Sequence, residues 1–581
     1  MKQLLQNMRD GKIEVADVPV PIPQTGMLLV RNAASLVSAG TERMLVEFAG
    51  KSLLEKARSR PDLVKQVIDK ARREGWLSSV EAAFNRLDQP MTLGYSCAGT
   101  VAASGEGVQG YKIGQRVACA GGGYAVHAEY VVVPVNLAVT LPDDVDFESA
   151  AFTTLGAIAM HGFHLGGAQL GERVAVVGLG LLGLLTVGIA KAAGCRVIGI
   201  DLDPKRVELA RKLGAEAVVR QGAEEAVLAF TGNQGADVVL ICADSESNDP
   251  VELAGEVARE RGRVVAVGAV GMDIPRRTYY YKELDVIVSR SYGPGRYDPD
   301  YEEGGHDYPA AYVRWTAGRN MAGFVELLAG KQLDITSLIT HRIPVEDAAE
   351  AYDLITGKSD ESFLGVVLTY PGAETSTALS RKIVVPSERK ISGSVKLGVL
   401  GAGLYAKAVI LPIMKKQKET ELVGIASASG TNASHAAKKF GFRYASSDGD
   451  QLIQDPEVNT LAVLTRHHLH AEQTLAGLRA GKHVFCEKPL AMNNEQLEEI
   501  ESQLQQPDCP LLMVGYNRRF APLAIQLKTY LDERHEPLMA YYRVNAGLLP
   551  LSHWTHDPQQ GGGRIIGEGC HFIDFLLWLV G

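Results

Sequence analysis

The sequence predicts an α/β protein with two doubly wound parallel sheets in one chain, and three observations lead to this prediction. Two glycine patterns, GLGLLG at Gly178–Gly183 and GAGLYA at Gly401–Ala406, lie about 220 residues apart. Each follows an apolar, β-branched run and precedes a helix-forming stretch, the strand–turn–helix setting that G-x-G-x-x-(G/A) requires. Around each pattern, strand-like runs alternate with helix-like segments, which is typical of parallel sheets.

The first 370 residues divide into a β region and an alternating region. Residues from about 12 to 45 and from 92 to 140 read as short strands broken by Gly and Pro. Between them, about 42–90 is helical and strongly charged, either a solvated insertion or a dimer contact. From about 150 to 285 strands alternate with helices, and residues 285–370 return to mixed short elements. The strands expected in the alternating region are Val174–Val177, Arg196–Ile200, Asp237–Ile241 and Arg263–Val267.

The rest of the chain repeats the alternation once. Thr375–Ser394 is rich in Ser and in Lys and Arg, which indicates a linker. A second alternating region runs from Lys396 to about Gly515. From Tyr516 a further α+β unit begins, with a strand expected around Met539–Val544.

Length and composition bound the class of protein. A chain of 581 residues is too long for one core, so two or three domains are expected. The net charge of −9, without a basic run, argues against a nucleic-acid partner. No apolar stretch has the length of a signal peptide or a membrane span, and the seven cysteines are scattered without a C-x-x-C pair. We therefore expect a cytoplasmic, homo-oligomeric protein that acts on a small molecule, with no membrane partner.

The glycine patterns indicate dinucleotide binding in two Rossmann domains. Without side chains, glycines allow a tight turn and let a pyrophosphate approach the free N–H groups of a helix N-terminus. The residues expected to contact cofactor in this way are Gly178, Gly180 and Gly183 in the first domain and Gly401, Gly403 and Ala406 in the second.

The residue after the second strand of each domain predicts the form of the nicotinamide cofactor. Asp201 follows Arg196–Ile200, 23 residues beyond Gly178, where a carboxylate accepts both ribose hydroxyls and repels a 2′-phosphate. This favours NAD in the first domain, the alternative role for Asp201 being a helix N-cap. In the second domain Leu422–Ala426 is followed by Ser427, and no acid stands there, so NAD and NADP both remain open.

Residues 1–370 resemble the medium-chain dehydrogenase/reductase family. The matching pieces are Ala39-Gly40-Thr41-Glu42, Gly94-Tyr95-Ser96-Cys97-Ala98-Gly99-Thr100-Val101, Gly114-Gln115-Arg116-Val117, Gly122-Gly123-Tyr124-Ala125 and the first glycine pattern. The resemblance implies a GroES-like catalytic domain over residues 1–165, with a helical insertion at about 42–90. It implies a Rossmann domain over 166–285 and a return to the catalytic domain over 286–372.

The zinc ligands of that family have no counterpart in this sequence. The positions that carry them in zinc-dependent members are here Ala39, Tyr95, Ser96 and Leu155. Zinc needs thiolate, imidazole or carboxylate donors, and the four-cysteine structural lobe is also absent. The resemblance is therefore to a zinc-free member, in which proton transfer comes from organic side chains. His127, Tyr95 and Ser38 are candidates for it, with structural roles as the alternative.

The segment Arg290–Tyr297 combines two arginines and two tyrosines on a Gly/Pro loop. Guanidinium and phenol groups in that setting could hold an anionic sugar or a phosphate. A plain surface loop is the alternative.

From Lys396 onward the chain resembles the Gfo/Idh/MocA family of oxidoreductases. The matching pieces after the glycine pattern are Thr465–Glu472, Gly481–Ala491, Gly515–Phe520 and Gly561–Asp574. The resemblance implies a linker over 373–395, a Rossmann domain over 396–515 and the start of an α+β substrate domain over 516–581. Because family members continue with most of an antiparallel sheet, we expect this domain to be incomplete and the chain to be truncated.

The same resemblance assigns the catalytic residues. The Glu-Lys-Pro piece implies that Lys488 orients or protonates the substrate hydroxyl and that Glu487 lies at the cofactor. His571 matches the family's general acid/base. Its usual aspartate partner, four residues earlier, is Gly567 here, and Glu568 is the alternative partner. His467, His468 and His470 could suggest a metal cluster, but the resemblance makes them a loop beside the cofactor, so no metal is expected.

These features predict a bifunctional, nicotinamide-dependent oxidoreductase of sugars or sugar nucleotides, in polysaccharide or cell-surface sugar biosynthesis. One alternative is a redox-neutral enzyme, an epimerase or an NAD-dependent glycosidic elimination enzyme. Another is a dehydrogenase whose amino-terminal half is a non-catalytic scaffold. Net turnover of free NAD(H) distinguishes the bifunctional oxidoreductase from the redox-neutral enzyme.

Overall fold

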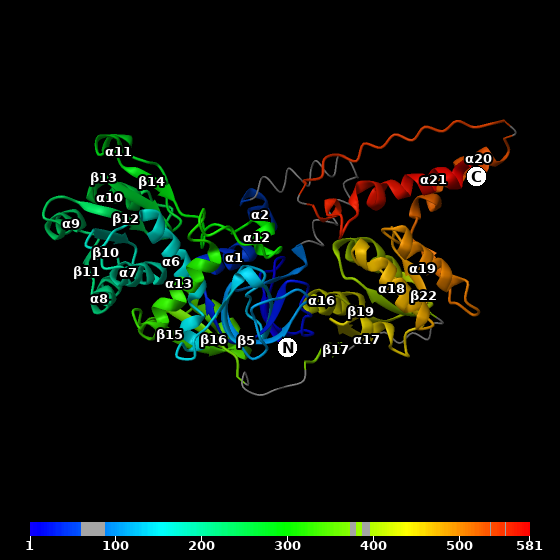
Figure 1. The fold of residues 1–581 in the computed structure, drawn as a ribbon, viewed down its shortest axis with the longest axis horizontal. Helices are drawn as coiled ribbons and strands as arrows, with labels where there is room; N and C mark the ends of the chain where they lie inside the picture. The colour runs from blue at the N-terminus through cyan, green and yellow to red at the C-terminus, as the bar shows by residue number, and fades with distance from the viewer. Residues whose placement is uncertain (60–86, 372–378, 386–394, 535, 552, 581) are drawn as a thin grey trace. The chain divides into compact units, whose positions relative to one another are not determined.

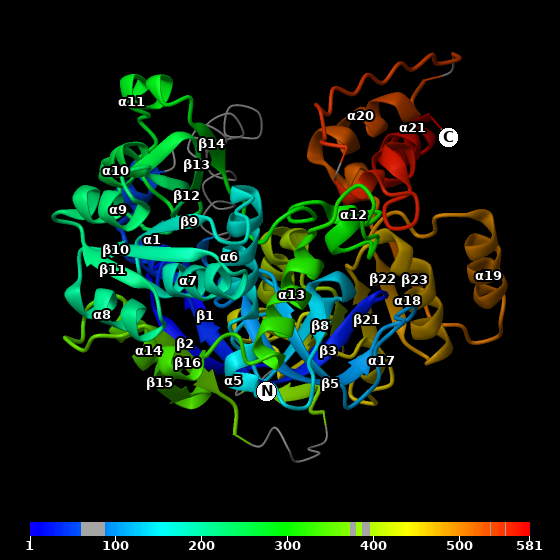
Figure 2. The same cartoon turned by 60° about the vertical axis from the view of Figure 1, so that its left-hand side comes forward.

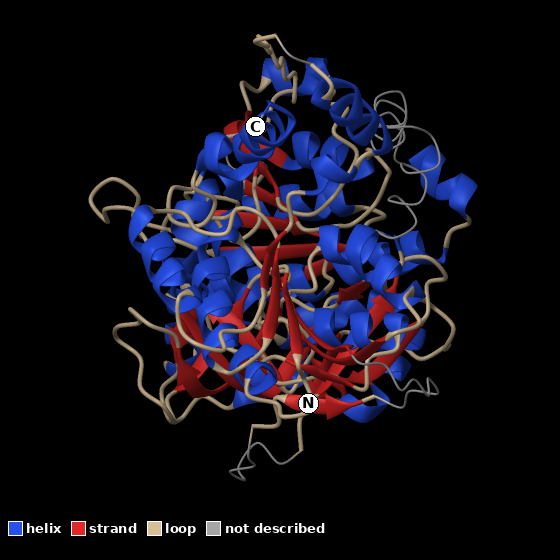
Figure 3. Ribbon diagram, turned by 90° about the vertical axis from the view of Figure 1, so that its right-hand side faces the viewer, coloured by secondary structure: helices blue, strands red, loops and turns tan. Residues whose placement is uncertain are grey.

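The computed structural model describes residues 1–59, 87–371, 379–385, 395–534, 536–551 and 553–580. The chain forms two compact units, the first built mostly from residues up to Ala378 and the second mostly from Leu379 onward (Figure 1). In both units the strands gather into sheets with helices around them (Figure 3). No helix among the described residues has the length and apolar character needed to cross a membrane.

The first unit begins with the predicted β domain. Its larger sheet has the order β15-β16-β3-β5-β6-β8, with β7 also paired to β3, and a small sheet has the order β2-β1-β4. Late strands β15 and β16 return to this sheet, as the family resemblance implies. The strands are β1 Lys2–Asn7, β2 Ile13–Asp17, β3 Met27–Val37, β4 Pro90–Thr92, β5 Ser96–Ser104, β6 Arg116–Ala120, β7 Tyr130–Pro134, β8 Ala138–Thr140, β15 Ile339–Pro344 and β16 Gly365–Thr369.

Helices of the first unit cover this domain and join it to the next. The expected helical insertion contributes α1 Thr41–Gly50 and α2 Leu53–Ser59, while residues 60–86 lie outside the described residues. The remaining helices are α5 Phe147–Ala150, α6 Thr153–Gly166, α12 Pro299–Glu302, α13 Ala317–Ala329 and α14 Ala348–Ile355.

The first Rossmann sheet is entirely parallel, in the order β11-β10-β9-β12-β13-β14 (Figure 2). Its central strands are apolar and buried because helices cover both faces. The elements are β9 Arg173–Val177, α7 Leu181–Ala192, β10 Arg196–Asp201, α8 Pro204–Lys212, β11 Glu216–Val219, α9 Ala223–Thr231, β12 Ala236–Ile241, α10 Asp249–Val257, β13 Ala258–Ala266, α11 Arg276–Tyr281 and β14 Asp285–Val288.

Two details of this sheet differ from the prediction. β13 begins at Ala258, before the expected start at Arg263, because Ala258 pairs with Ala236 across an irregularity in the β12–β13 register. β14 starts at the expected domain boundary, so the last strand of the sheet extends beyond residue 285.

The second unit contains a sheet in the order β17-β20-β19-β18-β21-β22-β23, parallel except for β17. Strand β17 lies inside the predicted linker and pairs antiparallel with β20 at the sheet edge, so this part of the linker is structured. The elements are β17 Lys382–Val384, β18 Val395–Leu400, α15 Leu411–Lys416, β19 Thr420–Ala426, α16 Gly430–Phe440, β20 Tyr444–Ser446, α17 Gly449–Ile453, β21 Thr460–Val463, α18 His467–Arg479, β22 His483–Cys486, α19 Asn494–Leu504 and β23 Leu512–Val514.

The described residues after Tyr516 are helical or irregular and include no strand. They form α20 Pro522–Asp532, a π-helical turn at Ile565–Gly569 and α21 Cys570–Val580, with short 3₁₀ turns at Asn517–Phe520 and Trp554–His556. The strand expected at Met539–Val544 is therefore wrong: the segment has no strand pairing and Met539 is 94% exposed. A strand needs a neighbour for its N–H and C=O groups, and the described residues offer none here.

Candidate functional site

The first glycine of each pattern is required by the neighbouring strand. Gly178 has φ +92°, and a Cβ there would lie 2.6 Å from the backbone nitrogen of Ala243, just beyond β12. Gly401 has φ +101°, and its Cβ would lie 2.5 Å from the carbonyl oxygen of Leu464, just beyond β21. Both turns thus need a residue without a side chain, for the same reason.

The remaining positions of the two patterns shape a cradle for an anion. At Gly180 a Cβ would meet only Arg206, at 3.9 Å, and at Gly403 it would meet nothing within 4 Å, so the space above both turns is open. Gly183 packs so tightly on Gly178 that a Cβ would overlap its carbonyl oxygen, whereas the second pattern accommodates the buried Ala406 where a π-helical turn, Ala406–Ile410, begins. Open space at an uncapped helix N-terminus fits a dinucleotide pyrophosphate.

Asp201 lies at the end of β10, where the sequence predicted a ribose-binding carboxylate. Its Oδ2 accepts a hydrogen bond of 2.6 Å from the N–H of Leu179 in the glycine turn, and its Oδ1 accepts one of 2.9 Å from Asp203. Arg206 lies 3.9 Å from Oδ2. The carboxylate is therefore fixed to the glycine turn.

Ser427 occupies the corresponding place in the second unit. It follows β19, and its N–H donates to the carbonyl of Ser446 at 3.0 Å. Ser429, two residues on, caps α16 through its hydroxyl. Neither side chain is charged, so this position lacks the carboxylate that distinguishes the first unit.

The positions that match zinc ligands are occupied by groups that bond within the protein. The Tyr95 hydroxyl donates to Ser38 Oγ at 2.8 Å, and the Ser96 hydroxyl donates to the carbonyl of Ala151 at 2.6 Å. Leu155 is buried and apolar, and Ala39 has no donor atom. These four residues do not fit a zinc ion, which needs sulfur, imidazole or carboxylate ligands.

Beside them lies a buried polar network that the sequence did not predict. Glu42 and His127, 1% and 0% exposed, approach to 3.2 Å between Oε2 and Nε2, and the same Oε2 accepts the hydroxyl of Tyr352. On the other ring nitrogen, His127 contacts Ser35 Oγ at 2.7 Å, and Ser35 contacts the Tyr370 hydroxyl at 2.7 Å. His127, a candidate for proton transfer, is thus closed in by protein groups. The only sequence signal for Glu42 was its place in the Ala39–Glu42 piece.

The two arginines of the loop Arg290–Tyr297 interact with side chains of the protein itself. Arg296 forms a largely buried ion pair of 2.6 Å with Glu302, and its guanidinium also stacks over Tyr292 and Tyr297. Arg290 stacks on Tyr297 as well. These contacts favour the structural alternative over an anion site.

In the second unit, the residues expected to act on substrate lie near the glycine turn. Tyr405, within the glycine pattern, donates its hydroxyl to Glu487 Oε1 at 3.3 Å, and Glu487 Oε2 accepts the N–H of Lys488 at 3.3 Å. Burial raises the pKa of the Glu487 carboxyl. These contacts bring Lys488 next to the cradle of Gly401–Ala406.

Lys488 and His571 differ in how they are held. The Lys488 ammonium donates to the carbonyl of Gly567 at 2.7 Å. His571 Nδ1 is buried without a hydrogen-bond partner among the described residues, and its ring lies edge-on to Tyr516. Burial, together with the positive charges of Lys488 and Arg518, lowers the pKa of His571 to about 4. A neutral imidazole with an unsatisfied nitrogen is available to a ligand.

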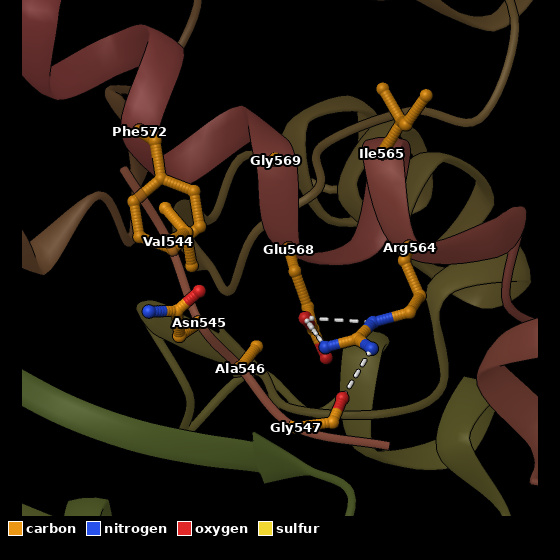
Figure 4. A pocket seen from close by; sticks show the side chains of 9 residues that line it. All are labelled: Val544, Asn545, Ala546, Gly547, Arg564, Ile565, Glu568, Gly569 and Phe572. Atoms are coloured by element: carbon orange, nitrogen blue, oxygen red, sulfur yellow. Dashed lines mark hydrogen bonds and ion pairs between the residues drawn. The ribbon is translucent and has the colours of Figure 1, made fainter. Parts of the chain in front are cut away.

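Glu568 does not replace the missing aspartate as the partner of His571. Its carboxylate accepts from Arg564 at 2.8 Å, on the wall of a groove of about 460 Å³ (Figure 4). The groove is lined by Val544, Asn545, Ala546, Gly547, Arg564, Ile565, Glu568, Gly569 and Phe572.

The three clustered histidines lie in the first turn of α18, not in a loop, so that expectation is wrong. His467 Nδ1 lies 2.9 Å from the carbonyl oxygen of Gly561, and His470 Nδ1 lies 2.7 Å from that of Pro489. Helix formation from residue 467 places His470 against the Glu487–Pro489 segment and His467 against Gly561.

Comparison with known proteins identifies three segments of the chain. Residues 68–143 match the alcohol dehydrogenase GroES-like domain, and residues 182–303 match the zinc-binding dehydrogenase family. Residues 395–516 match the Gfo/Idh/MocA oxidoreductase family with its NAD-binding Rossmann fold. Separate segments of the chain therefore match a medium-chain dehydrogenase and a Gfo/Idh/MocA Rossmann domain, and these matches support an NAD(P)-dependent oxidoreductase.

Individual relatives are dehydrogenases and reductases of sugars and polyols. D-xylulose reductase from Scheffersomyces stipitis is 29% identical over 317 residues, which are 46% of this chain and 80% of the relative. Levoglucosan dehydrogenase from Pseudarthrobacter phenanthrenivorans is 29% identical over 32% of this chain and 52% of the relative. Inositol 2-dehydrogenase 2 from Saccharopolyspora erythraea is 32% identical over 32% of this chain and 54% of the relative. The chain spans about half the length of the last two.

Proposed function

We propose that the second unit transfers hydride between a nicotinamide cofactor and a hydroxyl-bearing carbon of a sugar, polyol or sugar nucleotide, with Lys488 and His571 as its catalytic residues. The observation that carries this is the contrast between the two side chains. The Lys488 ammonium is held by a backbone carbonyl, whereas the neutral imidazole of His571 has a buried nitrogen without a partner among the described residues. The activities named for two relatives, levoglucosan dehydrogenase and inositol 2-dehydrogenase 2, support the substrate class.

The bound cofactor supplies the hydride acceptor or donor. Gly401, Gly403 and Ala406 shape its binding turn, and Glu487 lies between that turn and Lys488. In the oxidation direction Lys488 steadies the oxygen of the substrate hydroxyl, where negative charge develops. His571 accepts the hydroxyl proton on its unsatisfied Nδ1, and the low pKa keeps this ring neutral before the reaction.

The two Rossmann domains are proposed to differ in cofactor. Gly178, Gly180, Gly183 and Asp201 would hold NAD, because a carboxylate at the end of β10 would accept the ribose hydroxyls and its charge disfavours a 2′-phosphate. The uncharged Ser427 would admit either NAD or NADP in the second. Chemistry in the first unit would proceed without zinc.

A scaffold role for the first unit is the second candidate, and one observation favours it. Tyr95, at a position that matches a zinc ligand, bonds to Ser38. Within the Glu42–His127 network, the polar groups bond to one another. A site whose groups are all satisfied has less to offer a substrate.

The test is turnover by the full chain with inositol, levoglucosan or D-xylulose, with NAD(H) and NADP(H) each supplied and the reduced nicotinamide followed by absorbance. Lys488→Ala is expected to lower kcat by roughly 10²–10⁴, the usual contribution of a general acid/base, with cofactor affinity almost unchanged. His571→Ala should lower it as well. Lys416→Ala, an exposed lysine of α15, is the control. Unchanged kcat in Lys488→Ala would move the chemistry to the first unit.

A further inference from the structure

The imidazole of His467 fills the space where a side chain at position 567 would have to go. A Cβ on Gly567 would lie 2.8 Å from His467 Cε1 and 3.4 Å from its Nδ1. An aspartate, the residue that the family resemblance places here, would overlap the ring. The position of the His467 ring therefore favours a glycine at 567.

His467 is held rigidly in this position. The ring is buried, at 8% exposure, and packs edge-on against Trp554 with centroids 4.7 Å apart. Its Nδ1 lies 2.9 Å from the carbonyl oxygen of Gly561. Because a carbonyl only accepts, Nδ1 carries the proton and donates it. Burial lowers the pKa of His467 to about 4, so the ring is neutral at neutral pH.

The backbone that His467 contacts is the backbone that holds Lys488. Gly561 receives the His467 hydrogen bond, and Gly567, under the same ring, gives its carbonyl to the Lys488 ammonium at 2.7 Å. A helix-borne imidazole thus braces both ends of the segment Gly561–Gly567. The carbonyl at the end of that segment sets the direction of the ammonium.

We propose that His467 is a positioning residue of the carboxy-terminal site, which takes the place of the missing aspartate by bracing Gly567 so that its carbonyl orients Lys488. The inference rests on the proposed function for the role of Lys488 in catalysis, but the bracing can be measured without turnover. The proposal predicts that Lys488 keeps its orientation when His467 is replaced by alanine and Gly567 by aspartate in the same chain.

The experiment measures the rate at which acetic anhydride acylates Lys488 in the full chain, by peptide mass spectrometry, for four variants. They are His467→Ala, His467→Asn, Gly567→Asp and the pair His467→Ala with Gly567→Asp. Lys482 is the internal reference, because its buried ammonium is bonded to the carbonyls of Asp455 and Val458 and stays slow only while the unit is folded.

We expect His467→Ala to raise the Lys488 rate by about three- to tenfold, the equivalent of a lost hydrogen bond. His467→Asn, whose amide can still donate to Gly561, should restore most of the protection. Gly567→Asp alone should also raise the rate, since the aspartate displaces the ring. In the pair, the rate should return to the wild-type value or below, because a carboxylate now holds the ammonium.

Two results would overturn the inference: a wild-type Lys488 rate in His467→Ala with Lys482 still protected, or a pair no better protected than His467→Ala. If Lys482 is acylated rapidly in His467→Ala, the unit is not folded in that variant. The Lys488 rates in His467→Asn and in the pair then decide whether the inference holds. The outcome is separable from that of the proposed function. Full activity of Lys488→Ala would refute the catalytic assignment while leaving the bracing intact. An inactive Lys488→Ala, together with unaltered Lys488 labelling in all His467 variants, would refute the bracing while leaving the catalytic assignment intact.

Discussion

In the first unit the buried polar side chains Glu42 and His127 bond to each other and to their neighbours, whereas in the second unit a buried nitrogen of His571 has no partner among the described residues. The two glycine turns are built on the same geometry, so this difference does not come from the cofactor fold. A satisfied buried network stabilises one structure, and a catalytic role is one explanation for a buried group without a partner. The comparison supports a stabilising role for the Glu42–His127 network and agrees with the catalytic role proposed for His571.

The largest expected effect breaks the satisfied network. Glu42→Ala leaves His127 and Tyr352 buried without their acceptor and should lower the free energy of unfolding by about 2–6 kcal/mol, because each buried donor left unsatisfied costs about 1–3 kcal/mol. Chemical denaturation of the full chain, followed through the transition of the first unit, measures it. Glu47→Ala on the same helix removes only an exposed pair with Arg43 and should cost less than about 1 kcal/mol. Equal effects of the two substitutions would show that the network is not a stabilising feature.

A smaller effect tests the buried, neutral state of His467 through pH. His467 has a folded pKa of about 4, below the ordinary value of 6.5, so between these values the unfolded chain binds more protons. The contribution of His467 to the stability of the second unit is therefore complete above about pH 6.5 and falls as the pH drops toward 4. His467 alone contributes at most about 3 kcal/mol to this loss.

Denaturation of wild type and His467→Asn at pH 7 and near pH 4.5 measures this contribution. The variant should lose less stability between the two pH values, because asparagine does not titrate. Identical losses in the two proteins would contradict the buried, neutral state of His467.

The smallest effect sharpens the cofactor comparison. Asp201→Asn keeps an acceptor for the Leu179 N–H but removes the charge, and should weaken NAD binding to the first unit by about 1 kcal/mol while relaxing discrimination against NADP. Titration calorimetry of the full chain with each cofactor resolves the change, and Asp203→Asn, at the exposed N-cap of α8, is the matched control. The isotherm of the second unit should not move. Unaltered preference in Asp201→Asn would exclude a ribose role for this carboxylate.

Much of the fold could be predicted from local patterns. The glycine turns, the alternation of strands with helices and the β-rich start depend on spacing within about ten residues, and the structure reproduces them. For two short segments the local pattern predicts the wrong structure. The short strand Lys382–Val384 falls inside the predicted linker because its partner strand, β20, lies about 60 residues away in the sequence. The segment Met539–Val544 has the composition of a strand but no neighbour to pair with.

For the candidate site, the sequence by itself determined which residue types stand at which positions: Asp201 after the second strand, Lys488 in its Glu-Lys-Pro piece, and a glycine at 567. Only the tertiary structure decided what those positions mean. It joined Glu42 to Tyr352 across 310 residues of sequence and placed His467 against Gly567 from another helix. A local pattern fixes the backbone of a turn or helix. Hydrogen bonds and steric overlap between distant residues depend instead on side chains that folding brings together. The number of residues between two such side chains does not indicate that they will touch.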